Sequence, residues 1–259
     1  MGYIAALFIG ISLGLIGGGG SILTVPLLVY MFGVSPIVAT SYSLFVVGST
    51  SLVGSLSSYR KGWVDIKTAF IFGLPSIITV FIARKLIIPL IPPIINIGSF
   101  TVSFSILTMI LFAVLMLAAS LFMIKDSTGK IENIQNSKGP FSLTLYGIGT
   151  GLITGFLGAG GGFLLIPALI LALHFPMKKA IGTSLLIITL NGLIGFIADT
   201  GHYTINWRLL ISISAIAIGG VLIGGMLGKK IEGQKLKTGF GWFILLTGVY
   251  IIIREILFQ

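Results

Sequence analysis

Two glycine-rich stretches are the residues best placed to bind a ligand, because glycines leave the backbone exposed. The first covers residues 14–21 and contains four consecutive glycines, and a near copy covers residues 155–162. Glycine costs about 1 kcal/mol of helix stability relative to alanine, so we expect an apolar helix to break at each stretch. The helix that restarts at about Ser21 or Gly162 would present free N–H groups and the positive end of its dipole, which together bind anions.

Hydroxyl and amide side chains on the segments after the breaks supply further donors for an oxyanion. Under the alignment of the two copies, Ser43 matches Ser184 and Thr50 matches Asn191. The alternative is structural, because small residues let membrane helices pack closely and hydroxyls join them. The predicted substrate-binding residues are Gly18, Gly19, Gly20, Ser21, Ser43, Thr50, Gly160, Gly161, Gly162, Thr183, Ser184 and Asn191.

The carboxylates argue against cation transport. All lie near the ends of apolar segments, whereas cation pumps and sodium antiporters usually need a carboxylate within the membrane. They are Asp65, Asp126, Glu132, Asp199, Glu232 and Glu255. If protons are coupled to transport, Asp199 and His202 are the nearest candidates and His174 is a third. The alternative is that each of these three is a solvated loop residue.

No enzymatic or metal site is predicted. The chain contains no cysteine, no His-Glu-x-x-His motif, no paired acids within an apolar segment and no nucleophile beside an obvious base. We therefore expect no catalytic residue, no metal and no cofactor.

The composition predicts an all-α polytopic membrane protein whose surroundings are a lipid bilayer. The 259 residues are 56% hydrophobic and 8% charged, whereas soluble domains carry about 25% charged residues. The net charge of +10 does not indicate a nucleic-acid partner. Lysine and arginine fall almost entirely in short gaps between apolar runs, where the positive-inside rule accounts for them.

The chain divides into two copies of four apolar segments each. Moving residues 14–66 along by 141 positions aligns them with residues 155–207 without gaps, and Asp65 then matches Asn206 as a shared helix-start signal. We predict a first transmembrane repeat at 1–124, a polar linker at 125–140 and a second repeat at 141–259. The apolar segments are expected at 3–31, 36–58, 66–86, 98–124, 141–174, 178–198, 207–228 and 238–257.

The first segment of each repeat is predicted to be a re-entrant helix-loop-helix. Residues 3–16 make about 21 Å of helix, which is too short for a hydrocarbon core of about 30 Å. The alternative is one long, tilted and kinked helix. Re-entrant segments make the repeats inverted and leave four of the 16 Lys and Arg on the poorer side, whereas four spans per repeat divide them evenly. Those four are Arg84, Lys85, Arg208 and Arg254.

The positive-inside rule favours the inverted arrangement in the cell membrane. Both termini are then extracytoplasmic, and the cytoplasmic loops are 59–67, 125–140, 175–179 and 229–237.

The motifs together resemble the TauE/SafE family of sulfite and organosulfonate exporters. They are the glycine-rich breaks followed by Pro26 and Pro167, Ala-x-x-x-Ser-Leu at 39–44 and 180–185, the helix starts at 62–65 and 203–207, and the glycine-rich run at 218–225. One departure is Leu74-Pro75-Ser76, which occupies the first-half place of that glycine-rich run.

The resemblance implies a secondary transporter of a small sulfur-containing anion such as sulfite, thiosulfate or an organosulfonate. In inverted repeats the helix ends at the two breaks approach each other, so we expect the anion to bind between them near the midplane. Two alternatives stay open within transport. The protein could be an anion channel or facilitator with the same site, or a carrier of a small organic anion without sulfur. Two other classes are a membrane-embedded enzyme, for which the chain has none of the catalytic motifs above, and a purely structural subunit, which leaves the broken helices in both repeats unexplained.

The predicted topology has a direct test, because the chain has no native cysteine. A cysteine introduced by Ser127→Cys is expected to react with an impermeant maleimide only from the cytoplasmic side, since the linker lies there in the inverted arrangement. Labelling of this cysteine in intact cells would overturn the predicted orientation.

Overall fold

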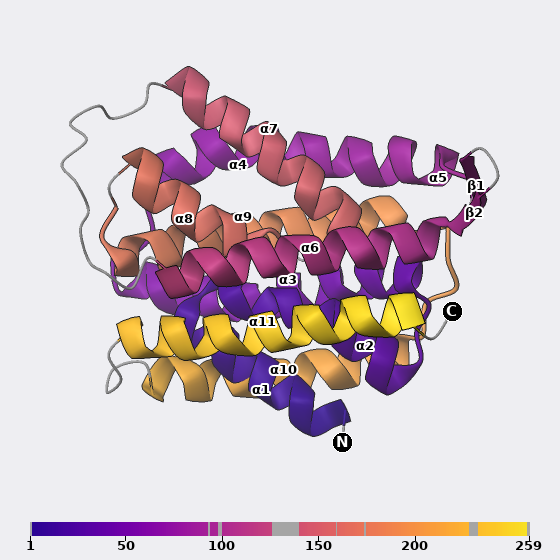
Figure 1. Cartoon of the computed structure of the whole chain (residues 1–259). Helices are drawn as coiled ribbons and strands as arrows, with labels where there is room; N and C mark the ends of the chain where they lie inside the picture. The colour runs from indigo at the N-terminus through magenta and orange to yellow at the C-terminus, as the bar shows by residue number, and fades with distance from the viewer. Residues whose placement is uncertain are drawn as a thin grey trace.

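Apolar helices make up most of the described chain, as the composition predicts. The computed structural model describes residues 2–92, 94–97, 100–125, 140–158, 160–173, 175–227 and 233–257 (Figure 1). The first half contains α1 (Gly2–Ile16), the 3-10 helix η1 (Gly18–Leu23), α2 (Thr24–Phe32), α3 (Pro36–Arg60), α4 (Ile66–Ile82), the π-helical turn η2 (Ala83–Ile87), α5 (Ile88–Leu90), β1 (Ile94–Ile97), β2 (Phe100–Ser103) and α6 (Phe104–Lys125). The second half contains α7 (Pro140–Leu157), α8 (Gly162–Leu173), α9 (Met177–Asp199), α10 (Trp207–Leu227) and α11 (Gly233–Leu257).

Five stretches of the described chain are helices long and apolar enough to cross a membrane. These stretches are α3, the continuous run Ile66–Leu90, Phe104–Leu121 within α6, α9 and α10. The all-α membrane class predicted from the sequence is therefore confirmed.

The first apolar segment reverses direction at its glycines instead of crossing as one rod. α1 ends at Ile16, and Gly17 has a φ of 82°, a left-handed conformation that glycine adopts without strain. The rings of Tyr3 and Phe32, at the two ends of the segment, lie 5.4 Å apart. The segment therefore enters and leaves at the same end of the bundle, and the alternative of one kinked helix does not describe it.

The fifth apolar segment also reverses. α7 follows α4 in parallel, because Gly147 packs on Phe72 and Gly151 packs on Ser76. α8 runs antiparallel to α9, with Gly162 against Ile188 at one end of the contact and Leu169 clustered with Ala180 at the other.

The parallel contact between α4 and α9 settles the direction of this second hairpin. Gly182 lies against Trp63 just before α4, and Gly195 lies against Val80 near its end. α7, α4 and α9 therefore run in one direction, and α8 returns against them.

α3 and α9 cross at the centre of the bundle in opposite directions. Gly48 and Gly192 touch at the crossing, and Gly54 packs on Leu185 while Gly195 packs on Leu44. Glycine at the crossing lets the two backbones approach without an intervening side chain. This crossing joins the two halves of the chain.

The contacts between helices come in reciprocal pairs. α1 packs on α10 and α7 packs on α4, while α10 also packs on α3 and α4 on α9. α6 lies beside α11 along one face of the bundle (Figure 1). Each of these contacts has a counterpart with the roles of the two halves exchanged.

Hydrogen bonds at the starts of α4 and α10 are reciprocal as well. The backbone N–H of Asp65 donates to Thr183 Oγ1 at 3.0 Å, and that of Asn206 donates to Tyr42 Oη at 2.6 Å. The side chains of Asp65 and Asn206 each accept a hydrogen bond from the backbone three residues on. The aligned helix starts predicted at these two positions are thus confirmed as N-caps.

The structure corrects two predicted boundaries. The helix expected to end at 86 continues to Leu90 through η2, and Pro89 explains the wide turn, because its ring clashes with the carbonyl four residues before it. The helix expected from 98 begins at Phe104, after the antiparallel pair β1 and β2. The β-branched residues of these strands, on either side of a Gly-Ser pair in the sequence, favour a hairpin.

Neighbouring glycines in α10 provide a matched test of the α1–α10 contact. A Cβ on Gly220 would overlap the carbonyl of Leu7 and lie 2.8 Å from the nitrogen of Ile11, whereas one on Gly219 would meet nothing within 4 Å. We expect Gly220→Ala to destabilise the protein by about 1–3 kcal/mol through overpacking. Gly219→Ala should leave stability unchanged or raise it slightly. Thermal unfolding in detergent measures both, and equal melting temperatures would contradict this packing.

Candidate functional site

The two glycine breaks are in direct backbone contact. A Cβ on Gly18 would overlap the backbone of Gly162, and a Cβ on Gly162 would overlap the Cα of Gly18. Gly160 and Gly161 have φ values of 66° and 69°, in the left-handed region that side chains rarely adopt. The sequence predicted that the breaks approach each other, and the contact shows that this position requires glycine on both sides.

Each break also packs on the long central helix of the other half. Gly17 lies against Ile181 of α9, and Gly158 lies against the backbone of Thr40 in α3. Gly160 contacts both Val47 and Ile188.

The same contacts orient two predicted hydroxyls. Residues 40, 43 and 47 lie on one face of α3, and residues 181, 184 and 188 lie on one face of α9. Ser43 therefore lies on the face of α3 that meets the second break, and Ser184 lies on the face of α9 that meets the first break at Ile181 and the second at Ile188. These are the aligned pair that the sequence singled out.

The remaining glycines of the predicted site support the hairpins from within. A Cβ on Gly20 would lie 2.7 Å from the carbonyl oxygen of Ile9 and the nitrogen of Leu13, so this residue packs on the backbone of α1. Gly161 lies against Thr154 Oγ1 of α7. Gly19 belongs to the 3-10 helix η1, which forms the first break.

Several predicted hydroxyls are bonded within their own segment. Ser21 donates to the carbonyl of Gly18 at 2.7 Å, and Ser184 donates to that of Ile181 at 2.9 Å. Thr50 donates to the carbonyl of Val46. A hydroxyl that donates in this way still has lone pairs but no second proton, so these three groups accept more readily than they donate to an anion.

Thr183 and Asn191 connect helices. Thr183 accepts the hydrogen bond from Asp65 at the start of α4, and Asn191 Nδ2 donates to Ser76 Oγ at 2.8 Å. Both therefore join α9 to α4, which the sequence did not predict. Asn191 Oδ1 has no hydrogen-bond partner among the described residues.

Unpartnered polar atoms gather around the breaks. Ser12 Oγ, close to Gly20, and Thr154 Oγ1, at Gly161, are buried without a hydrogen-bond partner in the described chain. The same holds for Thr24 Oγ1 and Ser43 Oγ. Each buried unmade hydrogen bond costs about 1–3 kcal/mol, so the region around the breaks favours a polar guest.

A buried ion pair lies beside the second break. Arg84 in η2 is fully buried, and its Nη1 lies 2.9 Å from Asp199 Oδ2 and donates to Thr40 Oγ1 at 3.1 Å. Counting Arg84 among the charges of a membrane face was therefore wrong. The apolar residues 86–91 were the missed signal, because they carry the helix past Arg84 and place it inside an apolar span.

The structure separates the two candidates for proton coupling. Asp199 is 5% exposed and paired with Arg84, so the alternative of a solvated loop residue does not hold for it. The side chain of His202 is exposed, and its backbone N–H donates to the carbonyl of Asp199. His174 lies outside the described residues. A proton-coupling role for Asp199 or His202 stays a prediction.

The end of the bundle at which α3 finishes and α9 begins is basic, with Arg60, Lys61, Lys67, Lys178 and Lys179. We call it the basic end. Lys179 pairs with Asp65 at 2.7 Å, and the ammonium groups of Lys61 and Lys178 lie 5.0 and 5.3 Å from the centroid of Trp63.

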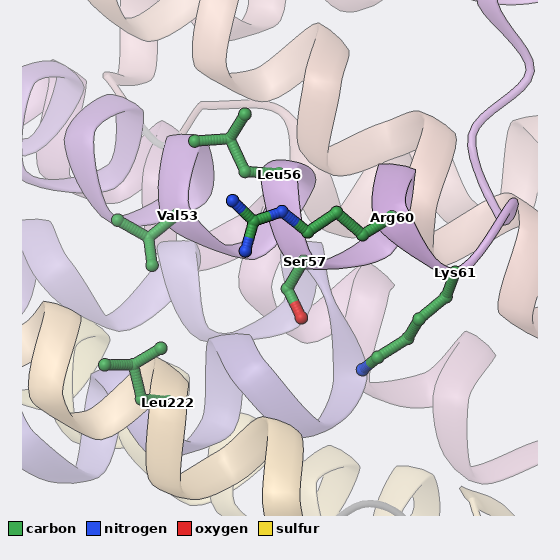
Figure 2. Close-up of a pocket in the computed structure, with 6 residues that line it drawn as sticks. All are labelled: Val53, Leu56, Ser57, Arg60, Lys61 and Leu222. Carbon is green, nitrogen blue, oxygen red and sulfur yellow. The ribbon is translucent and has the colours of Figure 1, made fainter.

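A pocket of about 390 Å³ opens at the basic end. Figure 2 shows the residues that line it, which come from the last turns of α3 and from α10. They are Val53, Leu56, Ser57, Arg60, Lys61 and Leu222.

Paired discontinuous helices inside a bundle of apolar spans are typical of membrane transporters. The family model described as "Sulfite exporter TauE/SafE" matches residues 3–251. The chain belongs to this family.

Curated relatives agree with the class. A "Probable membrane transporter protein" of Xylella fastidiosa (strain Temecula1) is 32% identical over 253 residues, which are 95% of this chain and 92% of the relative. The "Probable membrane transporter protein YunE" of Bacillus subtilis (strain 168) is 30% identical over 93% of each chain. A relative from Methanocaldococcus jannaschii with the same description is 26% identical over 96% of this chain and 94% of its own. No solved structure matches the chain.

The Asp65–Lys179 pair predicts a pH dependence of stability. The Lys179 ammonium and the backbone N–H of Thr68 hold the pKa of Asp65 below its usual value of 3.8. Because the folded pKa is lower than the unfolded one, the carboxylate stabilises the fold above pH about 4. This contribution is lost as the pH falls through the folded pKa.

Asp65→Asn is the informative variant, because asparagine keeps the N-cap, as at Asn206. The pair is partly exposed, so the variant should be less stable at pH 7 by less than about 1 kcal/mol. The difference should shrink to nothing as the pH falls below the folded pKa. Thermal unfolding of both proteins across this range measures it, and a difference that stays constant with pH would contradict the assignment.

Proposed function

We propose that this protein is a secondary transporter of a small anion, an oxidised sulfur species such as sulfite, thiosulfate or an organosulfonate. The observation that carries the proposal is the contact of Gly18 with Gly162 between the central helices. Broken helices that meet inside a bundle are how many transporters build a substrate site near the midplane. The family supports transport, and the class of anion follows from the family's description.

The two halves are related as inverted repeats in this proposal. Equivalent helices run in opposite directions: α3 is antiparallel to α9, α4 to α10 and α1 to α7. The reciprocal hydrogen bonds at Asp65 and Asn206 also fit a two-fold axis that passes between the halves. The basic end faces the cytoplasm, because the positive-inside rule places the richer side there.

The substrate site lies beside the touching glycines. The first N–H groups of α8, before Leu164, and those at the start of η1 precede the hydrogen-bonded turns of their helices and provide donors for an anion. Thr154 adds a buried hydroxyl without a described partner near Gly161, and Ser43 adds another on the face of α3 that meets the second break. Dipoles and hydroxyls bind an anion less tightly than a lone buried cation, which suits a carrier that must release its cargo.

The contact between the breaks closes the pathway in this conformation. Gly18 and Gly162 touch without side chains between them, so a small separation of the hairpins opens space for an anion. The pocket at the basic end, lined by Arg60 and Lys61, provides the cytoplasmic approach. Its positive charge raises the local concentration of anions.

Substitution at the contact tests the proposal. Gly18→Ala and Gly162→Ala each force a methyl group against the facing backbone, so we expect either variant to lower uptake. Overpacking of about 1–3 kcal/mol corresponds to a decrease of roughly 5- to 150-fold. The assay is uptake of radiolabelled sulfite or thiosulfate by proteoliposomes. Gly149→Ala is the matched control, because a Cβ there meets nothing within 4 Å in α7.

Uptake by either contact variant equal to that of the Gly149→Ala control would remove the breaks from the mechanism. Counterflow in the same vesicles separates the alternatives, because a carrier shows trans-stimulation and a channel does not. A thermal-shift screen with sulfite, thiosulfate, sulfate, sulfoacetate, taurine and simple carboxylates identifies the anion. Stabilisation by carboxylates alone would favour a carrier of organic anions without sulfur.

A further inference from the structure

We propose that the Nε and Nη2 edge of Arg84 is an oxyanion subsite beside the second glycine break, with the guanidinium held in place by Asp199 and Thr40. The subsite rests on the proposed function and names one part of its binding site. It takes anions that present two oxygens in one plane, such as a sulfonate, a sulfite or a carboxylate.

The position of Arg84 is unusual for a charged residue. It lies in the candidate membrane span Ile66–Leu90 and its side chain has no solvent exposure. A charged side chain within a membrane span is costly and is a functional-site hypothesis by default. Continuing the shift of 141 residues beyond the aligned stretch places Gly225 at the corresponding position, so the duplicated architecture does not itself require an arginine here.

Only one of the three guanidinium nitrogens of Arg84 has a hydrogen-bond partner among the described residues. Nη1 makes both described hydrogen bonds, to Asp199 and to Thr40. Nε and Nη2 are buried and make none with the described residues. One N–H of each points in the same direction, and together they form the fork that receives two oxygens of one anion.

Arg84, whose Nε and Nη2 edge is free, lies next to the proposed substrate site at the second break. The hydroxyl of Thr40 accepts from Arg84, while the backbone of Thr40 packs on Gly158. The preceding residue, Ala83, packs on Gly155, where a Cβ would lie 2.7 Å from its own. Arg84 therefore sits where α7 ends and the second break begins. Its backbone is a π-helical turn, a feature that often marks functional sites.

Asp199 holds Arg84 in place for an anion and does not block the subsite. Its carboxylate occupies Nη1, so it fixes the plane of the guanidinium and leaves the opposite edge available. It also offsets the positive charge, and an anion bound to a compensated arginine leaves more readily than one bound to a lone buried cation.

The test compares Arg84→Lys with its matched neighbour Lys85→Arg, which is exposed. Lysine keeps the charge for Asp199 but loses the fork. We measure binding of sulfite and of thiocyanate, a linear anion that cannot span the fork, to purified full-length protein. Arg84→Lys should weaken sulfite binding by about tenfold or more, change thiocyanate binding less than twofold and lower the preference for sulfite. Lys85→Arg should leave both unchanged.

The outcomes separate the subsite from the transport proposal. Sulfite binding by Arg84→Lys within twofold of wild type overturns the subsite, and the proposal for the glycine breaks stands. Wild-type protein that binds neither sulfite nor any other oxyanion of the screen overturns both.

A second measurement decides the matter if Arg84→Lys does not fold. The chain has four arginines, so wild-type protein labelled with [15N]arginine gives few Nε–H signals. The Arg84 signal is the one that persists in Arg60→Lys, Arg208→Lys and Arg254→Lys. It should shift on titration with sulfite and stay in place with chloride at equal ionic strength, and a signal that sulfite does not move overturns the subsite.

Discussion

Contact between bare backbones is the constraint on which the rest of this structure depends. Lipid tails are as apolar as the helices, so the hydrophobic effect does not drive helices together within a membrane, and close packing has to do so. Gly48 meets Gly192 where the central helices cross, and Gly18 meets Gly162 where the hairpins touch. The hairpins are too short to span, and these contacts with the other half are what bury their broken ends.

The ion pairs, unlike the helix contacts, are not repeated between the two halves. α4 and α9 are joined by an ion pair at each end, Asp65–Lys179 and Arg84–Asp199, with Asn191 and Ser76 hydrogen-bonded between them. With the same shift of 141 residues, Arg84 corresponds to Gly225 and Asp199 to Ser58, so this ion pair has no counterpart in the other half. The α4–α9 contact thus carries two ion pairs, a partly exposed one at the basic end and a buried one beside the second break.

The sequence predicted features that depend on local chemistry. The glycines at 17–20 and 158–162 break their helices, whereas the paired glycines at 219–220 and 224–225 stay within α10. Asp65 and Asn206 cap helices through neighbouring amides, so these breaks and caps followed from residue type and spacing. Arg84 did not, because its burial depends on a helix that continues past Pro89 and on Asp199 far away in the sequence. Only some of the hydroxyl positions could be predicted, for the same reason. The pairing of Ser43 with Ser184 followed from the alignment, whereas the hydrogen bond of Thr183 to Asp65 depends on the packing of α9 beside α4.

An anion carrier, the function proposed above, has to attract its substrate at the surface and release it from the interior, and the placement of charge in this chain fits both needs. The exposed cations at the basic end are screened by salt and act mainly on encounter. Inside, the guanidinium of Arg84 is shared with Asp199, so an arriving anion meets oriented N–H donors with little net charge. An unpaired buried arginine would hold the same anion more tightly and slow its release. Under the proposed subsite, Asp199 fixes the guanidinium of Arg84 and offsets its charge.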